Sequence, residues 1–230
     1  MYNPTFGEIK TMIQQELDLQ DETFITPKEI LNYINEGVKM VESTIHTIYE
    51  DYFLTQGNVS FVSNQATYSL PSNIYANKIR QLWYNDNNAL NYEIRKVRQL
   101  KEIQSVRYPD LYKYMITNDA VAGFKINFYP TPQENSSNCI IWYIRTAKQY
   151  EDNNDVCDIP EFANVVIQYG RWKCMSKEGH PDTDAAERDL IAMKQIMIDS
   201  LTARIPDEHN EVIQDVSFYE DFDNYFEGGW

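Results

Sequence analysis

The side chains that most often carry out chemistry in proteins occur in this chain, but they are widely spaced. The three histidines, His46, His180 and His209, are far apart in sequence. A catalytic triad or a zinc site needs several such groups to converge on one point. The sequence patterns place His46 on a helix, His180 in a turn and His209 in a tail. The sequence therefore predicts no catalytic residue and no metal site based on histidine.

The acidic segment Glu151–Asp155 has the composition of a calcium loop without its spacing. If Asp152 is the first ligand, Val156 takes the fifth position, and Cys157 stands where the EF-hand turn requires glycine. A solvated loop explains the segment better. Two carboxylates about 5 to 10 Å apart could hydrolyse a glycosidic bond, but with 35 Asp and Glu residues the sequence singles out no pair.

Other enzyme classes lose their usual support, because the sequence has no P-loop, dinucleotide-binding, zinc-protease or serine-hydrolase motif. The three cysteines, Cys139, Cys157 and Cys174, form no CxxC pair. Neither a disulfide framework nor a thiolate zinc site is expected from them. The sequence predicts no cofactor, and the free cysteines fit assembly in a reducing cytoplasm.

The net charge of −15 disfavours a protein that wraps nucleic acid, because affinity for phosphate backbones comes from Lys and Arg. Acidic walls would instead suit a channel through which DNA slides, since repulsion prevents sticking. The first ten residues lack the apolar core of a signal peptide, and no uncharged run reaches the roughly 18 apolar residues of a spanning helix. We therefore expect a soluble protein with no membrane contact.

Two capping boxes predict two N-terminal helices. Thr5 with Glu8, and Thr26 with Glu29, have the three-residue spacing that satisfies free amides at a helix start. A short helix is expected over residues 5–18, followed by a second helix of more than five turns. The apolar stripe of this second helix is Ile30, Ile34, Val38, Val41, Ile45 and Ile48.

A two-helix hairpin is expected over Asp158–Leu201. Asp158 with Glu161 has capping spacing, and Gly179 before Pro181 predicts the end of the first helix. The expected apolar face of that helix is Phe162, Val165, Val166, Tyr169, Trp172 and Met175, opposite Asn164, Gln168 and Arg171.

The second helix of this hairpin is apolar on more than one side. One stripe consists of Ala186, Leu190, Met193, Met197 and Leu201, and Ile191, Ile196 and Ile198 lie outside it. A helix of this kind is either deeply buried or shared with a neighbouring subunit. The hairpin is thus an ordinary core element in one interpretation, and the three isoleucines form part of a subunit interface in the other.

From Gly57 the apolar period changes from near 3.6 to 2, which predicts strands. Turn residues lie at Asn64-Gln65, at residues 86–88 and around Pro130, so three antiparallel hairpins are expected. The expected strand pairs are 59–61 with 68–70, 79–84 with 89–94, and 124–129 with 139–144. The apolar residues Val97, Leu100 and Ile103 predict a short helix between the second and third pairs.

One concentration of positive charge occurs in this acidic chain, on the expected short helix. Contact with an acidic partner surface, or with the acidic tail of another copy, would make it part of a subunit interface. A solvated helix face is the alternative. The residues are Arg95, Lys96, Arg98 and Lys101.

Residues 207–230 combine eight acidic residues with six large aromatic ones and contain no Lys or Arg. The charges resist collapse, whereas aromatic residues supply much of the anchor energy at interfaces. The composition favours a segment that orders against a partner, and a disordered solubilising tail is the alternative. The aromatic residues are Phe218, Tyr219, Phe222, Tyr225, Phe226 and Trp230.

These patterns predict an α+β fold. N-terminal helices and a C-terminal helical hairpin form a bundle, into which an antiparallel β module is inserted, and an extended tail follows. The expected segments are residues 1–56, 57–150, 151–205 and 206–230, in the order N-terminal helices, β module, hairpin and partner-binding tail.

Four motifs occur in a characteristic order: ILNYINEGVKMVE at 30–42, YSLPSNIY at 68–75, FYPTP at 128–132 before a WYIR strand, and DIPEFANVVIQYGRWKCM at 158–175. This order resembles that of the head-to-tail connector (adaptor) proteins of tailed bacteriophages. The resemblance covers nearly the whole chain and is strongest to the portal-proximal ring proteins of short-tailed and crAss-like phages.

The resemblance implies a protein without catalysis that forms a homo-oligomeric ring, usually a dodecamer, in the neck of the virion. The ring would bind the portal protein above and the next tail protein below, after assembly in the host cytoplasm. It would extend the channel for genomic DNA without binding that DNA specifically. The C-terminal segment of this family commonly docks along the portal, so the resemblance implies portal contacts for Phe218–Trp230.

Two other classes stay open. A carbohydrate-binding or receptor-binding virion module would use the aromatic residues of the β segment, because sugars stack on aromatic faces. A cell-wall hydrolase carried by the virion would depend on a specific carboxylate.

Overall fold

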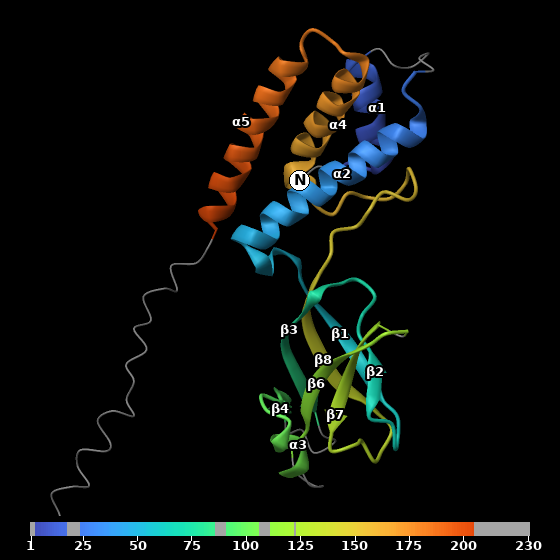
Figure 1. Cartoon of the computed structure of the whole chain (residues 1–230), viewed down its shortest axis with the longest axis vertical. Coiled ribbons are helices and arrows are strands. Elements are labelled where there is room, and N and C mark those ends of the chain that lie inside the picture. Colours follow the sequence, from blue (N-terminus) through green and yellow to red (C-terminus); the bar gives the residue numbers. More distant parts are fainter. Residues whose placement is uncertain (1–2, 18–23, 86–90, 106–110, 122, 205–230) are drawn as a thin grey trace, which may run out of the picture.

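The computed structural model describes residues 3–17, 24–85, 91–105, 111–121 and 123–204. Across this part of the chain the molecule has a helical body and a β module that projects from it (Figure 1), so the α+β class is confirmed. The helices are α1 (Phe6–Glu16), α2 (Pro27–Ile48), α3 (Lys101–Ser105), α4 (Ala163–Glu178) and α5 (Thr183–Thr202), with 3-10 turns η1 (Glu50–Phe53) and η2 (Pro160–Phe162).

The helical body is built around α2, which packs against α1, α4 and α5. Its predicted apolar stripe is buried from Ile30 to Ile45 and partly buried at Ile48, and it faces the apolar side of α4. Gly37 lets these two helices approach closely, since a Cβ atom there would lie 3.3 Å from side-chain atoms of Val166 and Tyr169. The start of α2 lies beside the end of α4, where Lys177 contacts Glu29.

Both predicted capping boxes are present. Thr5 caps α1 with Glu8, and Thr26 caps α2 with Glu29. The second box is tied to α4, because Lys177 Nζ donates a 2.6 Å hydrogen bond to Glu29 Oε1. That hydrogen bond, followed by those from Thr26, lowers the pKa of the Glu29 carboxyl from 4.5 to about 2.

Lys177→Met is expected to lower the unfolding temperature near neutral pH and to have less effect in acid. Because the pKa of Glu29 is depressed in the folded state, its ion pair stabilises the protein above about pH 4.5 and is lost as the pH falls to about 2. Thermal unfolding of both proteins between pH 7 and pH 2 tests this. Lys39→Met removes an exposed lysine from α2 and should give a difference that does not change over this range.

The start of α4 differs from the prediction. Its cap position is Phe162, with no side-chain cap, after the short turn η2. Asp158 does not cap the helix: its carboxylate pairs with Arg145 and accepts a hydrogen bond from the backbone N–H of Lys148. A charged partner and a free amide outside the helix thus compete successfully for this side chain.

The rest of the hairpin largely follows the sequence. Gly179 ends α4 in the left-handed conformation at φ 67°, and α5 buries Ala186, Leu190, Met197 and Leu201. Gln168 was expected on the polar face of α4 but is buried, because its Nε2 donates a 2.9 Å hydrogen bond to the Ala186 carbonyl of α5. A side-chain amide whose hydrogen bond is made within the protein can therefore be buried in the core.

The β module consists of two four-stranded sheets with the orders β1-β8-β3-β4 and β2-β7-β6-β5. Apolar and aromatic residues of the two sheets pack between them around Phe61 and Phe128. The strands are β1 (Leu54–Phe61), β2 (Thr67–Ser69), β3 (Ile74–Asn85), β4 (Asn91–Glu93), β5 (Arg95–Lys96), β6 (Lys113–Asp119), β7 (Gly123–Tyr129) and β8 (Ser136–Arg145).

One of the three predicted hairpins is correct. β3 pairs with β4 as expected, but β1 pairs with β8, and β2 pairs with β7. The strands on either side of Asn64 therefore lie in different sheets, as do β7 and β8 on either side of Pro130. Phe61 and Tyr68 still contact each other, with ring centroids 5.7 Å apart, across the interior between the sheets. Alternation identified the buried faces, whereas short turns gave the wrong partners.

Two further features of the β module were not predicted. Strand β6 lies between β7 and β5, and its pairing with β5 is parallel, so the second sheet is mixed. The basic cluster is also not on one helix. Arg95 and Lys96 form β5, Arg98 follows that strand, and Lys101 begins α3.

Candidate interaction surfaces

The solvent-facing half of α5 carries two exposed isoleucines, which lie about 140° apart around the helix axis. Ile191 is 61% exposed and Ile196 is 68% exposed, while Ile198 is partly buried. Burial inside this chain thus does not account for Ile191 and Ile196. Large apolar side chains that stay exposed are common at protein interfaces, so this face is a candidate contact surface.

An apolar hollow of about 470 Å³ lies between α4 and α5, next to this face. Arg204 pairs with Glu161 at its rim, and the described part of the chain ends there. The apolar side chains that line it are Phe162, Val165, Met193, Ile196 and Met197.

A second candidate surface is a groove in the β module. Two hollows, of about 680 and 410 Å³, share Arg80, Lys96 and Tyr114 in their linings and so adjoin; together they are called the groove. The groove runs between β3 of one sheet and β5 and β6 of the other. One end is at α3, remote from the helical body, and the other end reaches Glu50 of η1 (Figure 1).

The lining of the groove has a net positive charge, whereas the whole chain has a net negative charge. Six cations but only three carboxylates line it, whereas the whole chain has 20 cations and 35 carboxylates. The cations are Lys78, Arg80, Arg95, Lys96, Arg98 and Lys113, and the carboxylates are Glu50, Glu93 and Glu102.

The groove cations differ in how far they are neutralised. Arg80 pairs with Glu50 and Asp51 at 2.6 and 2.7 Å, and Lys78 pairs with Glu50. By contrast, exposed Lys96 and Arg98 make no ion pair with any residue that the structure describes. The middle of the groove therefore keeps positive charge that an acidic ligand could neutralise.

An irregular part of β3 shapes the end of the groove that lies next to η1, which we call its inner end. Ala76 and Asn77 have φ angles of 46° and 56°, in the left-handed region, and pairing with β8 is interrupted between Ile74 and Ile79. Such a conformation is unusual for residues other than glycine. The bulge removes ladder contacts here, and both residues line the smaller hollow.

Some of the groove's basic residues could be identified from the sequence. Arg95, Lys96 and Arg98 lie close together in the chain and were predicted as a basic cluster. Lys78, Arg80 and Lys113 were not predicted. The available signal was the two-residue spacing of Lys78 and Arg80, which places both on one face of a strand. Their proximity to β5 depends on the packing of the two sheets, which no local pattern reveals.

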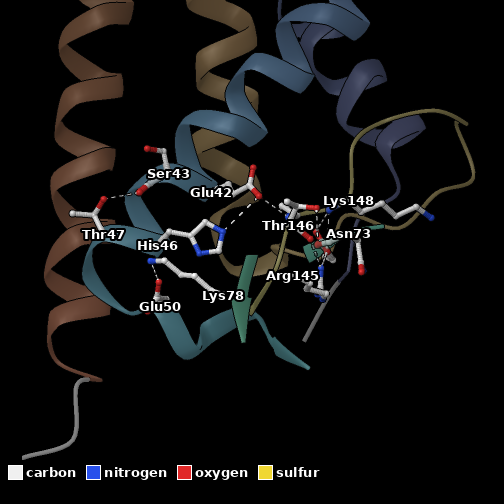
Figure 2. A network of polar contacts seen from close by, with 12 residues as sticks. Glu42, Ser43, His46, Thr47, Glu50, Asn73, Lys78, Arg145, Thr146 and Lys148 are labelled. Atoms are coloured by element: carbon white, nitrogen blue, oxygen red, sulfur yellow. Dashed lines mark hydrogen bonds and ion pairs between the residues drawn. The ribbon is translucent and has the colours of Figure 1, made fainter. Parts of the chain in front are cut away.

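Polar contacts join the β module to the helical body (Figure 2). Glu42 of α2 accepts a 2.8 Å hydrogen bond from the Ala147 N–H, and Asn35 of α2 bonds the backbone of Tyr150 in both directions. Within the module, the Thr146 N–H donates to the Asn73 carbonyl at 2.8 Å. These contacts fix the segment between β8 and α4, and the ion pairs of Lys78 and Arg80 with Glu50 fix η1, the turn between α2 and β1.

His46 packs at the same junction. Its ring stacks on Tyr75 of β3 with centroids 3.7 Å apart and also contacts Phe53. The imidazole nitrogens find no hydrogen-bond partner among the described residues, and the nearest carboxylate oxygen, on Glu42, is 3.6 Å from Nε2 (Figure 2). His46 therefore contributes mainly by packing to the orientation of the β module.

The cysteines are poor nucleophiles. Burial raises the pKa of Cys139 and Cys174 to about 12 and that of Cys157 to about 11. Thiols with such values stay protonated at neutral pH. Within the described residues no three His, Cys, Asp or Glu side chains gather as a metal site would need, and no helix has the length and apolarity to cross a membrane.

The aromatic tail residues, Phe218 to Trp230, lie outside the described residues. Comparison with known families gives a match to the SU10 adaptor protein family over residues 4–212, which includes both the helical body and the β module. The chain belongs to the SU10 adaptor family. No curated protein matches it significantly.

Membership gives the protein a structural role as a bacteriophage head-tail adaptor. An adaptor of this family associates with portal and tail proteins in the neck of the virion. The family match ends at residue 212, so the adaptor's aromatic residues from Phe218 onward lie beyond it.

Proposed function

We propose that this SU10 adaptor forms a dodecameric ring beneath the portal of a short-tailed or crAss-like phage. The ring extends the DNA channel and joins the capsid to the next tail protein. The observation that carries this proposal is the family match across residues 4–212. The net charge of −15 suits a channel that DNA traverses without specific binding.

The two candidate surfaces support a ring. Closed rings use head-to-tail interfaces, in which each subunit presents two different surfaces to its neighbours. Ile191 and Ile198 on one flank of α5, and Ile196 on the other, supply apolar side chains on the helical body. The basic residues Arg95, Lys96, Arg98 and Lys101 supply a charged one on the β module. In this proposal both surfaces lie at or near subunit boundaries.

The four segments would then have separate tasks. Residues 1–56 and 151–205 build the helical body of each subunit, and residues 57–150 form the module that projects from it. Residues 206–230 reach the portal, where Phe218, Tyr219, Phe222, Tyr225, Phe226 and Trp230 act as anchors. Aromatic side chains suit this role because they supply large contact areas at low entropic cost.

Virus produced without this chain tests the proposed function. If the protein joins head and tail, infected cells will accumulate DNA-filled heads that lack tails in electron micrographs, and expression of the chain from a plasmid will restore tailed particles. Tailed particles in normal numbers would contradict the proposal.

The same experiment separates the alternatives. A receptor-binding module would leave tailed particles that adsorb poorly to the host. A cell-wall hydrolase would leave tailed particles that adsorb but have lost muralytic activity. Neither result is compatible with a connector.

A further inference from the structure

We infer that the acidic segment 207–215 of this chain docks in the basic groove of its own β module. The segment contains Asp207, Glu208, Glu211 and Asp215 and has no Lys or Arg. The groove has six cations and three carboxylates, and its Lys96 and Arg98 make no ion pair with the described residues. The charges of the two surfaces are thus complementary.

The point where the described chain ends favours this occupant. Arg204 follows α5 and lies against Phe162, with the guanidinium 6.0 Å from the ring centroid. Phe162 in turn lies 6.3 Å from Tyr52 of η1. Glu50, at the start of the same turn, lines the inner end of the groove. The C-terminal segment therefore begins close to one end of the groove.

The length of the segment sets how far it can extend from Arg204. An extended chain covers about 3.3 Å or more per residue, so the eleven residues from 205 to 215 can span about 36 Å. The sequence leaves three possibilities open for the basic cluster: a partner surface, the tail of another copy, or a solvated face. Because Arg204 lies near the groove, the tail of the same chain is a further possible occupant.

Energetics favour docking within one chain over docking between free chains. Solvent screens exposed ion pairs, so a few such pairs would hold a separate peptide only weakly. A short linker raises the effective concentration of the segment to the millimolar range. The groove is therefore occupied to a greater extent by a segment of the same chain than by a free peptide of the same charge.

Docking would give the tail a defined course. The groove leads from η1 towards α3, at the end of the β module remote from the helical body (Figure 1). A segment 207–215 held in it would deliver residues 218–230 to that end of the module. Only this consequence rests on the proposed function, since the docking itself requires neither a ring nor a portal.

Site-specific cross-linking of the full-length protein tests the docking. The three native cysteines are buried, so a bis-maleimide reagent will act on introduced surface cysteines. Asn210→Cys combined with Gln99→Cys, which lies beside Arg98 at the groove, is expected to give a cross-link within the chain in dilute protein. Asn210→Cys combined with Ser176→Cys, on the exposed face of α4, is the control for random encounters.

The charge dependence of this cross-link decides the inference. Lys96→Glu with Arg98→Glu should lower the yield at least about tenfold, because like charges then face each other. Addition of 1 M salt, where the screening length is about 3 Å, should do the same. Lysines at the four acidic tail positions should restore the yield in the charge-reversed groove. An unchanged yield after charge reversal, or an equal yield with the Ser176→Cys control, would overturn the inference.

A mixture of two singly labelled chains identifies the occupant. Chains that carry only Asn210→Cys and chains that carry only Gln99→Cys should give few linked dimers. Efficient linkage between them would mean that the groove receives the tail of a neighbouring copy, which contradicts docking within one chain. Portal binding by the Lys96→Glu/Arg98→Glu protein is measured in parallel, so a failed proposal for the groove is not confused with a failed proposal for the ring.

Discussion

Replacing Val166 with aspartate is expected to remove a large part of the protein's free energy of unfolding at 25 °C. Val166 is completely buried in α4, where α2 approaches closely at Gly37. An aspartate there would be a buried charge without a partner, and such a charge costs about 3–5 kcal/mol. Total stabilities of domains are only about 5–15 kcal/mol, so the change removes a large part of the margin. Urea unfolding followed by circular dichroism measures it.

Asn164→Asp provides the matched control for this prediction. It places the same new charge on α4, but Asn164 is exposed in the first turn of the helix. A carboxylate at a helix N-terminus is favourable by about 0.3–1 kcal/mol, so stability should stay the same or rise slightly. A Val166→Asp protein as stable as the Asn164→Asp protein would show that the packing between α2 and α4 is wrongly described.

Deleting residues 207–230 is expected to abolish portal binding without unfolding the helical body. Among the described residues the helical core ends at Leu201, so the thermal transition should be nearly unchanged. Each aromatic anchor at an interface contributes about 2 kcal/mol or more, so loss of the whole set should lower portal affinity at least about a hundredfold. Portal binding on a biosensor surface measures this.

Two full-length variants separate the halves of the tail. Serine at Phe218, Phe222 and Phe226 should weaken portal binding nearly as much as the deletion. Asn or Gln at the four acidic positions between residues 207 and 215 should release the segment from the groove and leave the aromatic anchors able to bind. Normal portal binding by the deleted protein would eliminate the proposed role of the tail.

The sequence predicted features that depend on neighbouring residues. The capping boxes of Thr5 and Thr26, the stop at Gly179 and the buried stripe of α2 all involve groups within a few residues of one another. Such local interactions leave a spacing that can be read directly. The α+β class followed from the change of apolar period at Gly57.

The sequence did not predict features that depend on distant partners. Asp158 has the spacing of a helix cap, yet Arg145 recruits it instead. Gln168 looks like a surface residue, yet a carbonyl of α5 satisfies it in the core. The turn at Asn64 looks like a hairpin, yet β1 and β2 belong to different sheets. In each case tertiary contacts outweighed a valid local preference.

Of the two candidate surfaces, one could be predicted from local sequence and the other could not. The exposure of Ile191 and Ile196 follows from helical periodicity, because both lie outside the stripe that packs on the body. The basic groove required the fold, since β3, β5 and β6 bring its cations together from three separate segments.

The most direct test of the central claim is electron cryomicroscopy of the full-length chain mixed with the portal of the same virus. The proposed function predicts a closed ring of twelve copies, coaxial with the portal, with density for residues 218–230 along the portal surface. Portal particles without added density at saturating concentrations of the chain, together with a chain that remains monomeric, would contradict it.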